Sequence, residues 1–589
     1  MRTQSVRAIA EDVNSRARSA EQVALEALER AAAYDGIQPE AWISRVAAAD
    51  VRARARLIDA RIAAGERLPL AGVPVAVKDN IDVAGLETTA ACPAFAYRAD
   101  KSAYVVDRLL DSGAVILGKT NLDQFATGLV GTRSPYGSSG CVFNREYISG
   151  GSSAGSAVLV AAGVVPLALG SDTAGSGRVP AAFNNLVGFK PTRGRWSARG
   201  LLPACRSLDC VTALTSDVED AALVDSIAHG FDRLDSYARR VPAGPPRIGA
   251  TFRFGVPRAQ QLTDLSSQDA RLFADALLRL SAAGGTAVEV DVTPLLEAAR
   301  LLYGGPWVAE RTAALESLLT TRPTAIHPVV RAIVQAGRGV SAVDAFRGFY
   351  SLQDHARTAE ELWDTIDVLA LPTTPTIYRR SEVLAEPVAL NSHIGLYTNF
   401  VNLLDMTAVS LPAGFRANRT GFGLSLIAPA FADRSLLELA ARYTRASSLP
   451  PAPELDLTPR DTRVMLAVVG AHLSGMPLNW QLTSRQARLV RATRTAPLYR
   501  LYAIANQSPP KPALVHAGPG GGPIELEVYE LEVGAFGSFV AEVPPPLAIG
   551  TVDLEDGTSV HGFVAEPRAL TGALDITAHG GWRAYLARR

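Results

Sequence analysis

The sequence predicts an α/β protein with a large domain followed by a smaller, β-rich α+β domain. From residue 70 onward, short apolar runs alternate with glycines and helical segments, a pattern typical of strands and helices around a buried sheet. The stretch SSLPPAPELDLTPRD at 447–461 is proline-rich and lacks periodicity, which indicates a linker. Short strand-like runs and turns follow it. We therefore expect domains at 1–446 and 462–589, joined by a linker at 447–461.

The individual elements are predicted from hydrophobic periodicity. Residues 1 to about 65 have helical spacing and predict amphipathic helices, and further helices are expected near 268–283 and 306–320. In the small domain, the pair Asp556-Gly557 between two strand-like runs predicts a hairpin turn. The expected strands are VPVAV (73–77), AVIL (114–117), VVPLAL (164–169), VLALP (368–372), RLYAIA (500–505), IELEVYELEV (524–533) and the two arms of GTVDLEDGTSVHGFV (550–564).

Composition excludes several functional classes. The 589 residues are 48% hydrophobic and 20% charged, enough for a large core, and Lys plus Arg equals Asp plus Glu at 58 each. Because no basic surplus exists, we expect no nucleic-acid partner. Four cysteines are too few for a disulfide framework. The N-terminus has no apolar run, and the longest apolar stretch (157–170) is shorter than the ~20 residues of a membrane helix. We expect a cytoplasmic enzyme without a membrane partner.

Some motif matches do not fit their context. Residues 113–120 satisfy the phosphate-loop expression, but Ala-Val-Ile-Leu inside it is typical of a buried strand. Residues 151–155 satisfy G-x-S-x-G, but a polar segment precedes them instead of a buried strand. A Ser–His triad with His393 or His472 stays formally open. The cysteines and histidines show no metal-ligand spacing, so we expect neither a metal nor a cofactor.

A dense Ser/Gly region lies between residues 149 and 177. Its two clusters, SGGSSAGSA and GSDTAGSGR, flank the apolar run AVLVAAGVVPLAL, which must be buried. A flexible linker is one interpretation, but glycines at both ends of buried elements favour close approach of the backbone to a ligand. The successive N–H groups of residues 173–176 are candidates for an anion-binding nest that holds an oxyanion.

Lys78 is the candidate base for a serine nucleophile, because no histidine occurs before residue 229. It directly follows the run VPVAV, and burial at a strand end lowers a lysine pKa until the neutral amine can act as a base. The alternative is a surface lysine paired with Asp79 or Asp82.

At these residues the sequence resembles the amidase signature family, over roughly 430 residues. The resemblance implies the family's mixed central sheet flanked by helices. The segments that carry it are GVPVAVKDN (72–80), GAVILGKTNLDQFA (113–126), SGGSSAGSA (149–157), GSDTAGSGRVPAAFNNLVGFKPTRG (170–194), LALPTTPT (369–376) and DMTAVSLPAG (405–414).

The resemblance implies a Ser-Ser-Lys triad in which Ser176 is the nucleophile. Ser152, after a cis peptide bond, would relay the proton to neutral Lys78. The family commonly has glycine where this chain has Ala154 and Ala174, and both replacements are small. The implied oxyanion hole consists of the N–H groups of Thr173, Ala174, Gly175 and Ser176.

The segment LYGGPWVAER (302–311) is similar to one in allophanate hydrolases that supplies a tyrosine and an arginine to the substrate. The matching residues are Tyr303 and Arg311, and FATGLVGTRSPYG (125–137) implies a backbone contact at Gly128. An arginine fork suits the carboxylate of the small anion allophanate. One continuous helix would place both side chains on one face, although Gly-Gly-Pro interrupts it. Without the resemblance, a surface arginine beside a core tyrosine is favoured.

The segments MLAVVGAHLSGMPLNWQL, YRLYAIA and FGSFVAEVPPPLAIGTVDLEDGTSVHGFVAEP resemble the extra C-terminal domain of allophanate hydrolases. That resemblance implies a fold similar to gamma-glutamylcyclotransferase-like proteins. It also implies that the domain decarboxylates N-carboxycarbamate, the amidase product, ending in ammonia and carbon dioxide. His472 matches the proposed functional histidine, since imidazole titrates in the range needed for proton transfer. A histidine that caps a strand is the alternative.

Together with the resemblance, these observations predict a hydrolase of linear amide C–N bonds that acts on allophanate in nitrogen metabolism. Urea degradation is the expected context, and triazine breakdown, which also delivers allophanate, stays open. The resemblance implies a homodimer, and a functional link with urea carboxylase is a further hypothesis. The first alternative is a broader amidase or the glutaminase subunit of an amidotransferase. The second is a non-catalytic scaffold, which the presence of all three triad residue types disfavours.

Overall fold

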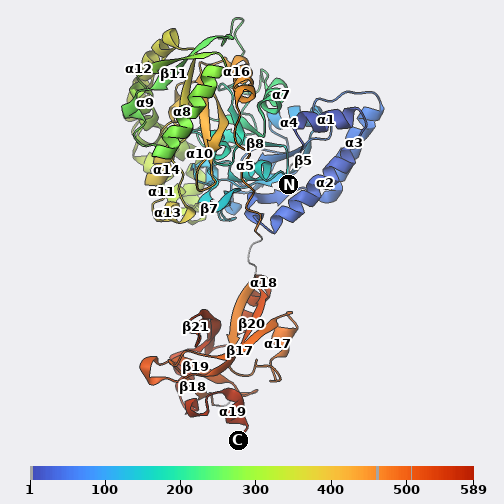
Figure 1. The fold of residues 1–589 in the computed structure, drawn as a ribbon, viewed down its shortest axis with the longest axis vertical. Coiled ribbons are helices and arrows are strands. Elements are labelled where there is room, and N and C mark those ends of the chain that lie inside the picture. The colour runs from blue at the N-terminus through green and yellow to red at the C-terminus, as the bar shows by residue number, and fades with distance from the viewer. Residues whose placement is uncertain (1–3, 459–462, 506, 589) are drawn as a thin grey trace. The chain divides into compact units, whose positions relative to one another are not determined.

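An eleven-stranded mixed sheet organises the first part of the chain in the computed structural model, which describes residues 4–458, 463–505 and 507–588 (Figure 1). The chain divides into two units, Met1–Pro459 and Arg460–Arg589. Helices flank the sheet of the first unit, and the second unit consists mainly of strands. The predicted α/β class with a smaller β-rich part is confirmed.

The sheet of the first unit mixes parallel and antiparallel pairs. The neighbours β5, β2 and β8 run parallel, as do β13, β11 and β12, and the other pairs are antiparallel. From one edge to the other, the strands are β1 (Trp42–Arg45), β5 (Val115–Thr120), β2 (Pro74–Lys78), β8 (Leu167–Asp172), β10 (Cys210–Thr215), β9 (Val187–Lys190), β14 (Thr407–Phe415), β15 (Gly421–Ala428), β13 (Val368–Pro372), β11 (Phe252–Pro257) and β12 (Gly285–Val290).

The four strands predicted in this unit are present; β2 and β5 start one residue later than expected, and one strand starts three residues later. The strand expected at 164–169 begins at Leu167. Gly163 has φ +71 and follows helix α5 (Ala154–Ala161) as its turn residue, and Pro166 cannot donate to a strand ladder. The residues from 163 to 166 therefore form the turn from α5 into β8.

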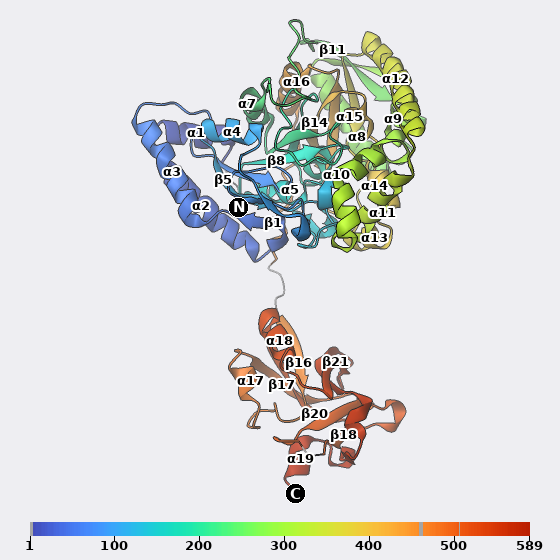
Figure 2. The ribbon, with the colours of Figure 1, turned by 180° about the vertical axis from the view of Figure 1, so that it is seen from behind.

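Helices gather at both ends of the sheet. Figures 1 and 2 show α1 to α3 at the β1 end and α9 to α14 at the opposite end. The predicted N-terminal helices and those near 268–283 and 306–320 are confirmed. Besides α5, the unit contains α1 (Val6–Asn14), α2 (Ala20–Asp35), α3 (Ala48–Ala63), α4 (Tyr104–Asp111), α6 (Arg178–Phe183), α7 (Val218–Ala228), α8 (Ser267–Ala282), α9 (Thr293–Gly304), α10 (Trp307–Thr321), α11 (Pro328–Ala336), α12 (Ala342–Thr365), α13 (Arg380–Ala385), α14 (Ala389–Ile394), α15 (Phe400–Leu403) and α16 (Asp433–Ala446).

Helix α5 lies in the interior of the unit and packs against β2 and β8. All of its residues except Ala161 are buried, and its sequence AGSAVLVA has no polar face. A helix that is apolar all round is stable only inside a protein. Its burial brings the Ser/Gly cluster before it into the interior, next to the ends of β2 and β8.

The proline-rich segment packs against the first unit over its described part. Leu455 and Leu457 contact the main core, and Asp456 accepts a hydrogen bond from Arg145 at 3.1 Å. Residues 459–461 of the expected linker lie outside the described residues. The division at residues 446 and 462 stays a prediction.

Over its described residues, 463–505 and 507–588, the second unit has two sheets and a separate hydrophobic core. The predicted hairpin is confirmed: β21 pairs antiparallel with β22, and Gly557 has φ +83 in the turn between them. The five-stranded sheet has the order β17 (Arg488–Arg494), β20 (Glu525–Glu532), β16 (Arg463–Val468), β22 (Ser559–Ala565) and β21 (Leu547–Asp553). The three-stranded sheet has the order β19 (Pro512–His516), β18 (Tyr499–Ala503) and β23 (Leu574–Asp575). The α-helices of the described part are α17 (Trp480–Thr483), α18 (Val533–Val540) and α19 (Trp582–Leu586).

Within the described ranges, no helix has the length and apolar character to cross a membrane.

Candidate active site

Lys78 ends strand β2 in the interior of the first unit, with its side chain fully buried. Its ammonium nitrogen contacts Ser152 Oγ at 2.7 Å and Ser171 Oγ at 2.9 Å. Burial lowers the pKa of Lys78 to about 7, although the carboxylates of Asp123, Asp209 and Asp172 oppose the shift. At neutral pH a large part of the side chain is therefore the free amine, which can accept a proton.

The surface alternative for Lys78 is wrong. Asp79 pairs instead with Lys119, whose Nζ lies 3.2 Å from Asp79 Oδ1, and Asp82 accepts hydrogen bonds from Thr88 and Tyr97. Among the described residues, Lys78 forms no ion pair with Asp79 or Asp82, and its side chain is buried instead of exposed.

Ser152 lies two residues before α5, which begins at Ala154, and the peptide bond between Gly151 and Ser152 is cis. The Ser152 hydroxyl is the direct partner of Lys78 Nζ, and the Ser153 N–H donates to the Ser176 carbonyl oxygen at 3.2 Å. The latter bond joins the two Ser/Gly clusters. No hydrogen bond links the Ser152 and Ser176 side chains in the described residues.

Ser176 is buried in the loop between β8 and α6, and its hydroxyl donates to the Gly128 carbonyl oxygen at 3.4 Å. Catalytic hydrogen bonds are often long in a free enzyme and shorten when substrate binds. Neither hydroxyl of Ser152 and Ser176 has a histidine partner among the described residues, and His393 contacts Tyr378 Oη instead.

The expected oxyanion hole differs at Gly175. Its N–H donates to Asp172 Oδ1 at 2.8 Å, so it is already engaged within the protein. A side chain is excluded there, because φ is +125 and a Cβ would collide with Thr398 Oγ1. For Thr173, Ala174 and Ser176, the described chain contains no partner of the backbone N–H group. These three groups are the donors that remain for an oxyanion.

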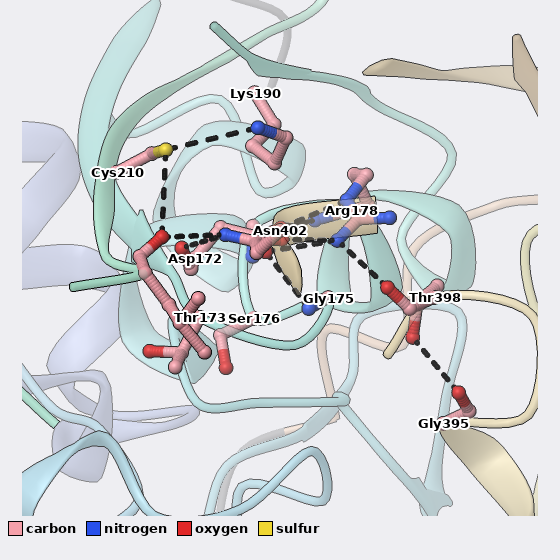
Figure 3. A network of polar contacts seen from close by, with 12 residues as sticks. Asp172, Thr173, Gly175, Ser176, Arg178, Lys190, Cys210, Gly395, Thr398 and Asn402 are labelled. Carbon is pink, nitrogen blue, oxygen red and sulfur yellow. Dashed lines mark hydrogen bonds and ion pairs between the residues drawn. The ribbon is translucent and has the colours of Figure 1, made fainter. Parts of the chain in front are cut away.

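A buried ion pair fixes this loop. The Asp172 carboxylate accepts from Arg178 Nε at 3.0 Å and Nη2 at 2.9 Å, and both side chains are fully buried. Burial alone raises the pKa of Asp172, but the Arg178 guanidinium outweighs it and holds that pKa below its usual range. Asn402, from α15, donates to the Asp172 carbonyl oxygen at 2.7 Å. Figure 3 shows the Ser176 hydroxyl pointing away from this network.

The Asp172–Arg178 pair predicts a large effect on stability. We expect Asp172→Ala to lower the free energy of unfolding of the first unit by about 3–5 kcal/mol, because it leaves a buried guanidinium without its counter-ion. Urea unfolding followed by tryptophan fluorescence measures this loss. The control is Glu438→Gln, which breaks the exposed pair with Arg434 and is expected to cost about 0.5 kcal/mol or less. A loss below about 1 kcal/mol for Asp172→Ala would contradict the fixing role.

A second buried carboxylate shapes the loop that carries Gly128. Asp123 accepts from the N–H groups of Val130, Gly131 and Arg133 at 2.9–3.1 Å. A Cβ on Gly128 would lie 2.6 Å from Asp123 Oδ2, so only glycine lets the loop close on this carboxylate. The Gly128 carbonyl oxygen is thereby held against Ser176.

Tyr303 and Arg311 lie on two helices and not on one. Tyr303 is near the end of α9, which stops at Gly304, and Arg311 is in the second turn of α10, which begins at Trp307. The guanidinium nevertheless lies over the tyrosine ring, 5.3 Å from its centre. The alternative of a surface arginine beside a core tyrosine is wrong, because the arginine is the buried one of the two. Arg311 is 1% exposed, whereas Tyr303 is only half-buried.

The Arg311 guanidinium is only partly satisfied within the protein. Its Nη1 donates to Thr127 Oγ1 at 3.1 Å, whereas Nε and Nη2 are buried without a hydrogen-bond partner. Nε and Nη2 form the edge of the fork that binds a carboxylate bidentately. Thr127 and Gly128 are consecutive, so one short loop contacts both the guanidinium and Ser176.

Asp209 is a titratable group that the sequence patterns did not predict. Its carboxyl accepts from Thr173 Oγ1 and, at 2.7 Å, from the Ala204 N–H. Burial raises the pKa of Asp209 to about 7, although Thr173 and the Arg311 guanidinium oppose the shift. It lies between the oxyanion loop and the arginine, and at neutral pH only part of it is ionised.

His472 lies in the second unit, half-buried between two aromatic rings. It stacks on Phe563 with ring centres 5.0 Å apart, meets Phe539 edge-on at 5.1 Å, and its Nε2 contacts Gln481 Oε1 at 2.8 Å. Burial lowers the pKa of His472 below its usual value. The neutral imidazole is therefore the main form of this side chain at neutral pH.

Among the described residues, no cluster of three or more His, Cys, Asp or Glu side chains has the geometry of a metal site.

The residues missed from sequence hold the predicted ones in place. Two of them, Ser171 and Asp172, end strand β8 beside Lys78, and parallel pairing of β2 and β8 predicts that neighbourhood once the strand order is known. Asp123 precedes the predicted loop at 125–137 by only two residues. Arg178 is the last residue of the second Ser/Gly cluster, and a basic side chain so close to a buried strand end was the available signal.

Comparison with protein families gives two matches. The family model described as amidase matches residues 22–437, and the one described as allophanate hydrolase C-terminal domain matches residues 464–587.

Known proteins resemble the chain over both units. Urea amidolyase of Saccharomyces cerevisiae is 43% identical over 96% of this chain, which spans 32% of that protein. The chain thus covers about a third of the length of the first curated relatives it matches. The solved structure of Kluyveromyces lactis allophanate hydrolase is 42% identical, with a TM-score of 0.69, 98% of this chain and 99% of that chain being covered. A glutamyl-tRNA(Gln) amidotransferase component of Symbiobacterium thermophilum is 36% identical over 68% of this chain and 88% of its own.

Proposed function

The chain belongs to the amidase family and carries an allophanate hydrolase C-terminal domain, and from this premise we propose that it hydrolyses allophanate. One observation carries the choice of substrate. A buried arginine with two unpaired donors contacts Thr127, the neighbour in sequence of Gly128, whose carbonyl oxygen accepts from the candidate nucleophile. Since an unpaired buried cation is costly, the site favours a substrate that brings its own carboxylate. Allophanate has one carboxylate and one terminal amide.

The proposed reaction begins with attack of Ser176 Oγ on the terminal amide carbonyl carbon. The Ser176 proton passes through Ser152 to neutral Lys78, and the oxyanion accepts from the N–H groups of Thr173, Ala174 and Ser176. The proton then returns by the same route to the leaving nitrogen, and ammonia departs. Water attacks the resulting acyl-enzyme with the same base and releases N-carboxycarbamate.

Tyr303 and Arg311 bind the substrate in this proposal. The Nε and Nη2 groups of Arg311 donate to the substrate carboxylate, and the Tyr303 ring supports the guanidinium face. The loop at Gly128 sets the distance between the carboxylate and Ser176. The buried position of these groups suits a small planar ion.

The second unit is proposed to promote loss of carbon dioxide from N-carboxycarbamate, with His472 as proton donor. Its place in a small cavity between Phe539 and Phe563 supports this role over that of a strand cap. The name of the yeast relative, urea amidolyase, supports a connection with urea breakdown, and the link with urea carboxylase belongs to the same proposal.

Arg311→Gln tests the substrate. We expect the variant to lose about 10²- to 10³-fold in kcat/KM for allophanate, because the carboxylate no longer meets a fixed cation. Hydrolysis of neutral malonamide should change by less than about threefold, since no carboxylate contact is lost. Ammonia release from purified protein measures both.

The matched control is Arg338→Gln, which removes an arginine that is paired with Glu316 and partly exposed. Its kinetics with both substrates should equal those of the wild type. Preferred turnover of glutamine or an aryl amide by the wild type would contradict the allophanate proposal and favour a broader amidase or a glutaminase component. No turnover of any amide would favour a non-catalytic scaffold.

A further inference from the structure

The second unit contains a cavity of about 160 Å³ that brings four polar side chains together. They are His472, Gln481, Lys511 and Glu542, and most of the remaining lining is apolar. Cavities that hold drug-sized ligands measure roughly 300–1,000 Å³, so this one suits only a small molecule. The charged side chains in its lining determine which kind of small molecule it can bind.

The two charged side chains in the lining differ in how they are balanced. Glu542 Oε1 lies 2.6 Å from Arg485 Nη2, so its charge is compensated from outside the cavity. Lys511 has no hydrogen bond or ion pair with its side chain among the described residues. The cavity therefore retains one uncompensated positive charge, which favours an anion.

The position of Lys511 is set by its backbone. Its carbonyl oxygen accepts from the Ile504 N–H at 3.1 Å, and β19 begins at the next residue. Lysine is rare in this chain, with five among 58 lysines and arginines. A compact ammonium at the end of a flexible stem fits a small cavity better than the planar guanidinium used nearly everywhere else.

His472 faces the same space with a fixed ring. Its Nε2 contacts the Gln481 amide oxygen, which can only accept, so the neutral ring carries its proton on Nε2. Nδ1 is then the lone-pair nitrogen, and within the described chain it has no hydrogen bond. The charge of Lys511 adds to burial in lowering the pKa of His472, which places the ammonium within electrostatic reach of the ring.

We propose that this cavity binds a small dianion with two carboxylates, that Lys511 holds one carboxylate, and that His472 faces the atom between them. This rests on the proposed function, in which the dianion is N-carboxycarbamate. A bound dianion offsets the charge of Lys511 and favours protonation of the imidazole at Nδ1. The ring is thus neutral before the ligand binds, and the ligand itself promotes formation of the acid.

One C–N bond of N-carboxycarbamate breaks, carbon dioxide leaves, and the electron pair of that bond stays on nitrogen and takes the Nδ1 proton of His472. The product is carbamate, still held by Lys511, and solvent returns one proton to the imidazole. The departing carboxylate becomes neutral in the apolar part of the cavity, where loss of charge is favoured. Carbamate then yields ammonia and a second carbon dioxide.

Malonate tests the binding site, because it is a stable dianion with a methylene in place of the N–H. In full-length protein labelled with ¹³C-histidine, the ring signal of His472 is assigned by its absence in His472→Gln. We expect malonate to raise the His472 pKa in the wild type. Lys511→Met should weaken malonate binding at this signal by about tenfold or more, equivalent to about 1.4 kcal/mol.

Two further variants separate charge from packing. Lys511→Arg keeps the charge but brings a larger, planar group, so it should bind malonate more weakly than the wild type and more tightly than Lys511→Met at the His472 signal. Lys101→Met removes an exposed lysine of the first unit and should bind malonate as the wild type does. Equal malonate affinity for Lys511→Met and wild type would overturn the proposal.

Turnover of allophanate distinguishes this proposal from the function on which it rests. Lys511→Met should release the first equivalent of ammonia at the wild-type rate and the second more slowly, with N-carboxycarbamate accumulating in ¹³C spectra. If Lys511→Met released both equivalents of ammonia at the wild-type rates, the role of Lys511 would be overturned and the amidase proposal would stay intact. Failure of the wild type to release ammonia from allophanate would overturn the proposed function, while the malonate titration would still decide the binding site.

Discussion

Replacing Ser176 by alanine is expected to abolish ammonia release from allophanate, with a loss of about 10⁵-fold or more in kcat. The hydroxyl is the only group of the proposed triad that forms a bond to the substrate. Alanine leaves the backbone N–H groups and Arg311 in place, so allophanate should still bind with a dissociation constant near the wild-type KM. Isothermal titration and an ammonia assay on the same preparation measure both quantities.

The control for Ser176 is another buried serine. Ser156 in α5 donates to the Leu169 carbonyl oxygen at 2.9 Å and contacts Thr120 Oγ1 at 2.7 Å, and it is not part of the proposed triad. Ser156→Ala should lower stability by about 1–3 kcal/mol while kcat stays within about threefold of the wild type. Turnover by Ser176→Ala above about 1% of wild type would contradict its role as nucleophile.

Replacing Lys78 by methionine is expected to lower kcat/KM by about 10²- to 10⁴-fold and to remove the acid limb of the pH profile. In the wild type the amine must be neutral to accept a proton, so activity should rise with pH through about 7, the pKa that burial gives Lys78. Below that pH, protonation removes the base. The profile of kcat/KM from pH 5 to 9 measures this limb.

A second lysine provides the comparison for Lys78. Lys101 is exposed, and Lys101→Met should leave both the rate and the limb near pH 7 unchanged. Asp209 also has a pKa raised to about 7, so it is the other group able to produce such a limb. Asp209→Asn separates the two, since the limb persists if Lys78 is the base. If the rise in activity near pH 7 disappeared in Asp209→Asn but persisted in the residual activity of Lys78→Met, the group that titrates would be Asp209.

Local patterns were enough to predict the elements that carry the site. The runs at 73–77 and 368–372 each correspond to a strand, because four or five consecutive apolar residues leave few alternatives in a buried sheet. Lys78 was predicted to be desolvated because it follows such a run directly, and its side chain is fully buried. In both cases the burial of a residue follows from its nearest neighbours in sequence.

Patterns failed where partners come from distant parts of the chain. The Asp172 loop is fixed by Asn402, 230 residues away, and Arg311 meets Thr127 across 184 residues. The Gly175 N–H, expected to face an oxyanion, donates to Asp172 instead. A sequence shows which groups can donate and accept, but several acceptors compete for each donor, and only the folded chain decides between them.

The sequence by itself therefore determined the α/β class, the buried strands and the Ser/Gly clusters, since these depend on periodicity and on local composition. The Ser-Ser-Lys site was implied by the resemblance of these segments to a known family. Only the tertiary structure decided that Arg311 is buried with two free donors, that a break between two helices brings it over Tyr303, and that Lys511 shares a cavity with His472. The physical reason is that hydrogen bonding and desolvation depend on distances across the fold, whereas hydrophobic patterning depends on neighbours in the chain.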